Sequence, residues 1–222
     1  MEIKMVENKK NIIDEDYQNK RYIYRFFKRT LDVIGSGIGL IILSPLFLII
    51  SILIKCEEPS GPIFYSQIRL GKNQKPFKMY KFRSMVVNAD QMLEQLMKQN
   101  EVEGAMFKIK EDPRVTKIGK FIRKHSIDEL PQLWNVLIGH MTLVGPRPPL
   151  KREVLGYTTY DKQRLIVKPG CTGLWQVSGR NDVGFEEMVE LDLKYIEKSS
   201  VWYDFEILFK TIWIVVSPNG AY

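Results

Sequence analysis

Residues 33–54 read VIGSGIGLIILSPLFLIISILI, a run that contains no charged side chain. As one straight helix it would reach about 33 Å, which is enough to cross the hydrocarbon core of a bilayer. Ser44 and Pro45 stand at its middle, and proline removes a backbone donor and clashes with the preceding turn, so a kink or a break is expected there. The run predicts either a single membrane-spanning helix or a helix–break–helix that enters and leaves through the same face of the membrane.

Basic side chains flank this run on both sides: Lys28 and Arg29 precede it, and Lys55 follows it. Positive charge beside membrane helices tends to stay in the cytoplasm, so two basic flanks favour the re-entrant form, while the residues alone leave both topologies open. Asp32, at the edge of the run, needs a partner, and Arg29, one turn earlier, is the candidate.

The overall charge points to an anionic partner. The formal net charge is +7, which suits nucleic acid, anionic lipid or a phosphorylated substrate. No nucleic-acid recognition motif is visible, and nucleic-acid binding would leave the membrane run unexplained, so we expect no nucleic-acid partner. Cys56 and Cys171 form no C-x-x-C pair, and His125 and His140 lack zinc-type spacing with them, so neither a disulfide framework nor a zinc site is expected.

The chain after the membrane run predicts a mixed α/β domain with short strands, many helices and no standard parallel sheet. We expect extended segments at 63–67 and 77–82, helices at 88–99, 116–124, 127–138, 185–197 and 201–216, and rigid loops at 145–149 and 168–173. The last of these helices carries Trp202, Phe209 and Trp213 at helical spacing. Such a helix belongs either to the buried core or to the membrane interface, where tryptophan is favoured.

The sharpest local signal is SIDELP at 126–131. Pro131 is tolerated only in the first turn of a helix, so a helix is expected to begin close to Asp128, and Ser126 with Glu129 has the spacing of a capping box. Asp128 and Glu129 then lie side by side at a helix N-terminus. They either stabilise the helix through its macrodipole, or they do chemistry, with Asp128 holding Mg²⁺ or attacking phosphorus and Glu129 acting as a base.

Several cations are candidates for holding phosphate groups near this carboxylate pair. Arg123 belongs to a basic stretch just before it, and Arg147 lies between two prolines that fix its backbone. Lys81 and Arg83 alternate with aromatic residues on the second extended segment, and Arg180 ends a glycine-rich stretch suited to a nucleotide base and ribose. The alternative for these residues is a solvated or lipid-facing basic surface.

The ordered motifs together resemble the bacterial sugar transferase family, the monotopic polyprenol-phosphate phosphoglycosyl transferases. The resemblance runs from about Lys28 to the C-terminus. It rests on Lys28-Arg29 with Asp32, the Ser44-Pro45 break, YKFRSM at 80–85, SIDELPQLWNV at 126–136, LVGPRP at 143–148 and KPGCTGLWQVSGRN at 168–181.

The resemblance implies a reaction and roles for its residues. Asp128 would attack the β-phosphorus of a UDP-sugar, UMP would leave, and polyprenyl phosphate would accept the sugar phosphate from Asp128. Glu129 would assist proton transfer, Mg²⁺ would bind at Asp128, and Lys81, Arg123 and Arg147 match phosphate-handling positions. The product would begin a capsule, exopolysaccharide or glycoconjugate, and the sugar itself is not specified, although galactose or glucose is our first expectation.

The resemblance also implies an organisation. We predict an α+β fold with a polar N-terminal arm at 1–27, a re-entrant membrane helix at 28–56 broken at Ser44 and Pro45, and a mostly helical catalytic domain at 57–222 on the cytoplasmic face of the bacterial cell membrane. Relatives often carry extra membrane spans before this core, which groups this chain with the small forms. Expected partners are a UDP-sugar, polyprenyl phosphate and membrane lipid, with a second copy of the chain and downstream glycosyltransferases as further candidates. A membrane-tethered scaffold without catalysis, or direct transfer in a ternary complex, are the rival hypotheses.

Overall fold

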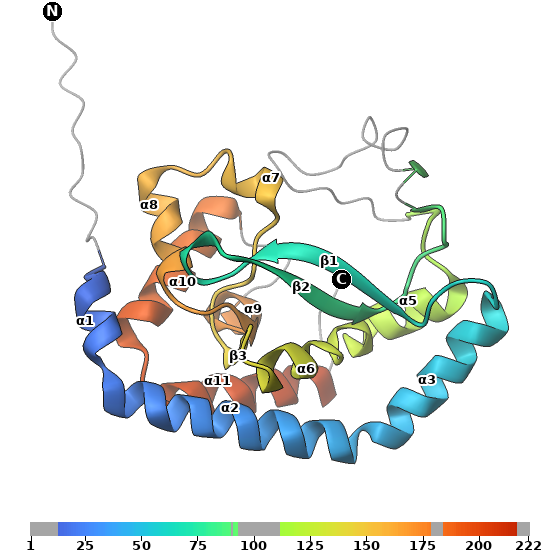
Figure 1. The fold of residues 1–222 in the computed structure, drawn as a ribbon, viewed down its shortest axis with the longest axis horizontal. Coiled ribbons are helices and arrows are strands. Elements are labelled where there is room, and N and C mark those ends of the chain that lie inside the picture. Colours follow the sequence, from blue (N-terminus) through green and yellow to red (C-terminus); the bar gives the residue numbers. More distant parts are fainter. Residues whose placement is uncertain (1–12, 90, 93–111, 179–183, 217–222) are drawn as a thin grey trace, which may run out of the picture.

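The computed structural model describes residues 13–89, 91–92, 112–178 and 184–216 of the chain (Figure 1). Within these ranges helices predominate and strands are short. The helices longer than four residues are α1 (Glu15–Lys20), α2 (Tyr22–Ile42), α3 (Ser44–Glu57), α5 (Lys117–Lys124), α6 (Gln132–Leu137), α9 (Leu174–Ser178), α10 (Phe185–Lys198) and α11 (Val201–Val216). The short helices are η1 (Lys72–Gln74), η3 (Ile127–Glu129), α7 (Lys151–Val154), α8 (Thr159–Lys162) and η4 (Gln163–Ile166), and the strands are β1 (Phe64–Leu70), β2 (Pro76–Phe82), β3 (Thr142–Val144) and β4 (Gly170–Thr172).

The apolar run forms two helices, and the chain is bent by 58° between them (Figure 1). α2 ends at Ile42, and α3 begins at Ser44 with Pro45 in its first turn, where a missing backbone donor costs no hydrogen bond. The Ser44 hydroxyl donates to the carbonyl oxygen of Ile41 across the break, at 2.8 Å. The break predicted at Ser44 and Pro45 is therefore confirmed, and α2 extends back to Tyr22, into the stretch assigned to the polar arm.

Much of the surface of this bent pair is apolar and exposed. Among the described residues no single helix is long and apolar enough to cross a bilayer, whereas α2 and α3 taken together meet that test of length and composition. The large exposed side chains on the pair are Tyr22, Ile23, Phe26, Phe27, Val33, Ile34, Ile38, Ile41, Ile42, Leu48, Ile49, Ile52 and Leu53. An apolar surface of this extent marks a membrane or protein contact.

The first half of α2 is tied to the rest of the fold by buried charges. Lys28 donates to Asp204 of α11 and to the carbonyl oxygen of Val144, at 2.9 Å each. The predicted pairing of Asp32 with Arg29 is wrong, because Asp32 accepts from the hydroxyl and backbone N–H of the segment 142–143, at 2.8 Å each. Arg29 instead donates to the last carbonyl groups of α6, where a cation is favoured by the helix dipole.

Two short sheets organise the domain. β1 and β2 form an antiparallel hairpin, which confirms the two predicted extended segments, and the hairpin runs across the molecule in Figure 1. β3 and β4 pair in parallel, Thr142 opposite Gly170 and Val144 opposite Thr172. The prediction of a loop over all of 168–173 is wrong at this point, because residues 170–172 supply the second strand of this pair.

The helical predictions were confirmed in part. α5, α10 and α11 lie at the predicted ranges. The single helix expected over 127–138 is instead the short 3-10 turn η3 followed by α6, and Pro131 occupies the N-cap position of α6. Most of the helix predicted at 88–99 lies outside the described residues.

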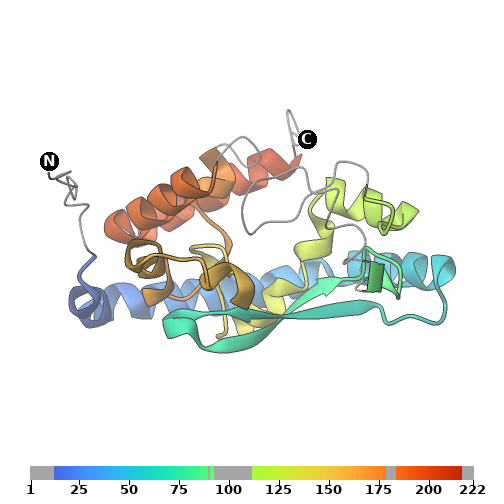
Figure 2. The ribbon, with the colours of Figure 1, turned by 90° about the horizontal axis from the view of Figure 1, so that it is seen from above.

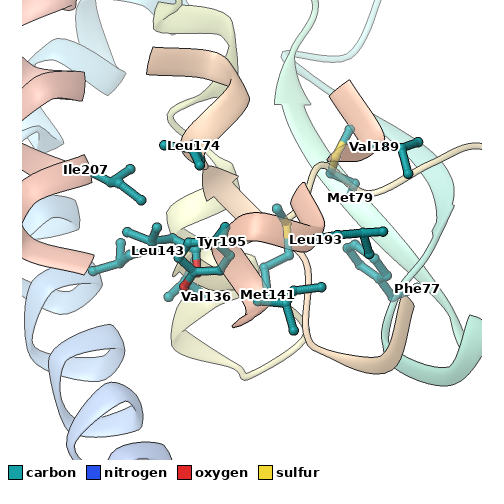
Figure 3. Close-up of a cluster of buried hydrophobic side chains, with 12 residues drawn as sticks. Phe77, Met79, Val136, Met141, Leu143, Leu174, Val189, Leu193, Tyr195 and Ile207 are labelled. Atoms are coloured by element: carbon teal, nitrogen blue, oxygen red, sulfur yellow. The ribbon is translucent and has the colours of Figure 1, made fainter. Parts of the chain in front are cut away.

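A shared apolar core joins the hairpin, the parallel pair and the C-terminal helices. Figure 3 shows Phe77 and Met79 of β2 gathered with residues of α6, β3, α9, α10 and α11. Figure 2 shows the hairpin, in green, and the C-terminal helices α10 and α11, in orange to red, on opposite sides of the molecule. Beside it, Arg164 of η4 and Asp192 of α10 form a fully buried ion pair. α11 contributes the buried Ile207 to the core while Trp202, 83% exposed, and Trp213 face outward, so it is both a core helix and an exposed apolar surface.

Candidate active site

A tight turn between α5 and α6 presents the acidic pair. Ser126 adopts a left-handed conformation (φ 55°, ψ 20°), which reverses the chain after α5, and η3 follows at once with Asp128 and Glu129. The predicted capping box is wrong, since the Ser126 side chain makes no capping hydrogen bond. The Glu129 carboxylate instead binds Lys81 of β2, so the acidic turn is held by another element rather than by its own cap.

The turn is packed against the end of the bent helix pair. Ile127 contacts an apolar cluster made of Ile50 and Ile54 of α3, Phe82 of β2 and Ile122 of α5. The Glu57 carboxylate at the end of α3 accepts from the first two backbone N–H groups of α5, at 2.8 and 2.9 Å. Asp128 is therefore carried by a segment that is fixed to α3.

The two carboxylates lie in different environments. Asp128 is only 7% exposed, and burial raises its pKa to about 6, against the opposing effect of Lys81 and Arg123 and with a smaller contribution from the negative charge of Glu129. Partial burial alone would raise the pKa of Glu129 as well, but Lys81, Arg147 and Arg69 more than offset this, so its pKa lies below the usual value. Asp128 thus has a pKa much closer to neutral pH than an ordinary aspartate, although it is still largely ionised there, and Glu129 is held fully ionised.

Lys81 connects β2 to the acidic turn. Its ammonium group lies 2.5 Å from the Glu129 carboxylate, whose side chain is 46% exposed. The buried Asn135 of α6 fixes the strand beside it: its amide oxygen accepts from the N–H of Tyr80 at 2.9 Å, and its amide nitrogen donates to the carbonyl oxygen of Lys78 at 2.7 Å. Sequence reasoning missed Asn135, although a lone polar residue inside LWNVL was a usable signal.

The structure brings Arg123 and Arg147 to the pair from two further directions. Arg123, in the last turn of α5, is exposed and lowers the pKa of Asp128. Arg147, in the proline-flanked loop after β3, lowers the pKa of Glu129, and its guanidinium carbon lies 5.9 Å from the centre of a Trp175 ring. Three of the predicted cations, Lys81, Arg123 and Arg147, therefore act on the carboxylate pair.

The other two predicted cations differ. Arg83 is buried and turned to the loop after α3, where it donates to the carbonyl oxygen of Glu58 at 3.0 Å and lies 3.6 Å from its carboxylate. These contacts place it at the loop after α3 rather than at the acidic pair, and a Cβ on Gly61 would lie 1.1 Å from its guanidinium, so only glycine at position 61 leaves room for it. Arg180 lies outside the described residues.

One cation was missed altogether. Arg69 of β1 is 7% exposed, and burial followed by the nearby Arg147 lowers its pKa to about 10. The predicted extended segment ended at residue 67, and nothing in GlnIleArgLeuGly at 67–71 signalled a buried arginine.

Comparison of the sequence with known proteins identifies a family. The model of the bacterial sugar transferase family covers residues 23–218. This chain belongs to the bacterial sugar transferase family. Among curated relatives, the chain is 48% identical to galactosyl transferase CpsE of Streptococcus agalactiae over 90% of its own length and 44% of that protein. It is 47% identical to the undecaprenyl-phosphate galactose phosphotransferase of Salmonella typhimurium, over 89% of its own length and 42% of the relative.

A shorter relative matches the chain nearly end to end. The exopolysaccharide production protein ExoY of Rhizobium meliloti is 41% identical over 95% of the chain and 94% of the relative. The chain thus spans less than half the length of the streptococcal and Salmonella proteins and nearly all of ExoY.

Proposed function

We propose that this protein transfers a sugar 1-phosphate from a UDP-sugar to polyprenyl phosphate and releases UMP, as the first step in building a polysaccharide or glycoconjugate. Family membership supports the chemical class, since one relative is named for galactose phosphate transfer to undecaprenyl phosphate. The observation that carries the proposal is the buried, cation-surrounded Asp128 on a turn packed against the apolar helix α3. A phosphorylated water-soluble donor and a lipid phosphate acceptor both fit a carboxylate in that position.

In the proposed first step, a carboxylate oxygen of Asp128 attacks the phosphorus that bears the sugar. An oxygen–phosphorus bond forms to Asp128, and the bond from that phosphorus to the oxygen bridging the two phosphates breaks, so UMP leaves with the bridging oxygen. The raised pKa of Asp128 is consistent with a weakly solvated and therefore reactive carboxylate that is still largely ionised at neutral pH.

In the second step, a phosphate oxygen of the polyprenyl phosphate attacks the same phosphorus and the bond to Asp128 breaks. The product is a polyprenyl diphosphate sugar, and the Asp128 carboxylate is regenerated. Glu129, held ionised beside Lys81, would accept the proton of a monoprotonated acceptor phosphate. Lys81, Arg123 and Arg147 would stabilise the charge on the phosphoryl oxygens.

The carboxylate pair is also the place for the proposed Mg²⁺. Magnesium is usually held by one or two carboxylates together with substrate phosphate oxygens and water, and Asp128 with its neighbour Glu129 provides such a donor set. Within the described residues no group of three or more metal-ligating side chains gathers, which fits an ion shared with the substrate diphosphate better than an ion caged by protein. When bound, the ion would neutralise diphosphate charge.

We further propose that α2 and α3 form a re-entrant membrane hairpin at the cytoplasmic face of the cell membrane. The 58° bend and the exposed apolar side chains of both helices support this. Thiol labelling in a variant that lacks Cys56 and Cys171 tests it, with single cysteines introduced before Lys28 and after Lys55. Accessibility from opposite sides of the membrane would rule out the hairpin.

The catalytic proposal is tested by incubating purified protein with Mg²⁺ and a panel of UDP-sugars, galactose and glucose first, without acceptor lipid. We expect stoichiometric UMP release and a protein mass increased by one sugar phosphate. Asp128→Asn should give neither while keeping its association with membranes, and Asp16→Asn, an exposed carboxylate of α1, is the matched control. Turnover with acceptor present but no adduct under any quench would favour the ternary complex, and activity unaffected by Asp128→Asn would favour a non-catalytic scaffold.

A further inference from the structure

One face of the β1–β2 hairpin carries two cations, Lys81 and Arg69. Residues directly opposite each other in an antiparallel pair share a face, and here Tyr65 is opposite Lys81 and Arg69 is opposite Phe77. Arg69 lies four residues after Tyr65 on the same face, which places it about 13 Å along the strand from the position of Lys81. Lys81 binds Glu129 directly, whereas Arg69 reaches the loop that carries Arg147.

The guanidinium group of Arg69 is committed to protein acceptors. Nη1 donates to the carbonyl oxygen of Pro148 at 3.1 Å, and Nε and Nη2 both donate to the amide oxygen of Gln67, at 3.1 and 2.8 Å. Gln67 and Arg69 are two residues apart on the same strand, so a neighbour on β1 orients the forked guanidinium group that donates to the loop. A lysine has no such fork and would not reproduce this geometry.

The loop at 145–149 is held on its other side by the parallel strand pair. The N–H of Gly145 donates to the carbonyl oxygen of Thr172 at 2.8 Å, and the N–H of Gly170 donates to that of Pro146 at 2.9 Å. On the hairpin side the N–H of Leu70 donates to the carbonyl oxygen of Pro149 at 3.0 Å. Arg147 thus lies between residues 145–146, which bond to the strand pair, and residues 148–149, which bond to the hairpin. The Arg69 bond to Pro148 is the hairpin contact closest to Arg147 along the chain.

Two arginines in a poorly solvated region repel each other, so a buried Arg69 beside Arg147 is unfavourable unless it has a compensating role. We propose that Arg69 is a positioning residue for Arg147. By holding the Pro148 carbonyl group, it keeps the loop, and with it the Arg147 guanidinium, directed at Glu129 and at the substrate phosphate. The inference rests on the proposed function of the site and adds a residue that does not itself contact the reacting atoms.

A double-mutant cycle tests this role through the rate of UMP release from the accepted UDP-sugar. Arg69→Gln should slow release about a hundredfold, the effect of misplacing a charge-stabilising group by about an ångström. If Arg69 acts through Arg147, adding Arg69→Gln to Arg147→Gln should cause no further loss. Arg152→Gln is the control. Arg152 is an exposed cation near Arg69, but it bonds to neither Gln67 nor Pro148, so its loss should leave the rate close to that of the wild type.

A second arm keeps the test decisive if Arg69→Gln folds poorly or if Arg147→Gln is too slow to measure. Gln67→Met retains the charge of Arg69 but removes the acceptor that orients it, so it should weaken UDP-sugar binding in an Asp128→Asn background and have no effect when Arg147→Gln is also present. Titration calorimetry measures this binding without turnover. Losses that multiply in either cycle would overturn the positioning role, whereas a wild-type protein that releases no UMP with any UDP-sugar would instead overturn the proposed function.

Discussion

Replacing Asp128 with asparagine should abolish activity and at the same time make the fold more stable at neutral pH. Burial raises the pKa of this carboxyl from 3.8 to about 6, so the folded state binds a proton more tightly than the unfolded state does. Stability contributed by this group is therefore greatest below its unfolded pKa and falls as the pH rises from about 4 to about 6. Above that window the ionised carboxylate is a constant penalty on folding.

The size of the penalty follows from the shift. A difference of about 2 pKa units corresponds to about 3 kcal/mol, which is an upper limit for what Asp128→Asn would recover at pH 7.5. For a chain of this size that gain raises the melting temperature by at most about 12 °C. At pH 4, where the carboxyl is protonated in the folded state, the gain should largely disappear.

The neighbouring carboxylate provides the matched control. The pKa of Glu129 is lowered by Lys81, Arg147 and Arg69 against the effect of burial, so its ionised form stabilises the fold above its unfolded pKa. Glu129→Gln should therefore lower the melting temperature at pH 7.5, opposite in sign to Asp128→Asn, and have less effect at pH 4.

The assay is thermal unfolding in one detergent at pH 4, 5.5 and 7.5 for the wild type and both variants. The reasoning fails if Asp128→Asn is destabilising at pH 7.5, or if its gain is the same at pH 4. It also fails if the two substitutions change stability in the same direction at pH 7.5. Loss of UMP release combined with a gain in stability would identify Asp128 as a residue kept for chemistry at a cost to folding.

Three other perturbations have outcomes that the structure specifies. Single-turnover UMP release should rise roughly tenfold between pH 5 and pH 7 as Asp128 ionises. Lys81→Met removes a charge that lowers the pKa of Asp128, so this variant should move the rise to higher pH. A rate that does not change with pH would contradict the role of the carboxylate. Asp192→Ala leaves Arg164 buried without a counter-charge and should destabilise the fold by about 3–5 kcal/mol, measured as a lower melting temperature. An unchanged melting temperature would show that the pair is solvated. Gly119→Ala places a Cβ 2.0 Å from the backbone oxygen of Ser84 and should lower the free energy of unfolding by at least about 2 kcal/mol. Gly37→Ala is the control: a Cβ there has nothing within 4 Å, so the melting temperature should stay unchanged or rise.

Several features of the fold and site were accessible from local chemistry. Proline at position 45 broke the apolar run because a missing donor and a ring clash act within one turn of helix. The hairpin strands, α5, α10 and α11 followed from side-chain periodicity. The motif at 126–131 and the lone arginine between prolines pointed to the carboxylate pair and to one of its cations.

Features that depend on long-range partners were not accessible in this way. The parallel pair joins Thr142 to Gly170, and no local pattern in the segment 168–173 distinguishes such a strand from a loop. The capping box failed because Glu129 finds a charged partner 48 residues away, and a bond to an ammonium group is stronger than one to a backbone N–H. Asp32 likewise bonds to β3 rather than to Arg29 one turn away.

The chain's own chemistry determined where the membrane run bends, which carboxylates stand together and which residue types surround them, because these depend on neighbours in sequence. Only the tertiary structure decided that Asp128 is buried while the adjacent Glu129 is paired, and that Arg69 rather than Arg83 supports the site. The reason is that solvent exclusion and electrostatic coupling depend on distances between α3, β2, α5 and the loop at 145–149, and the packed core brings those elements together.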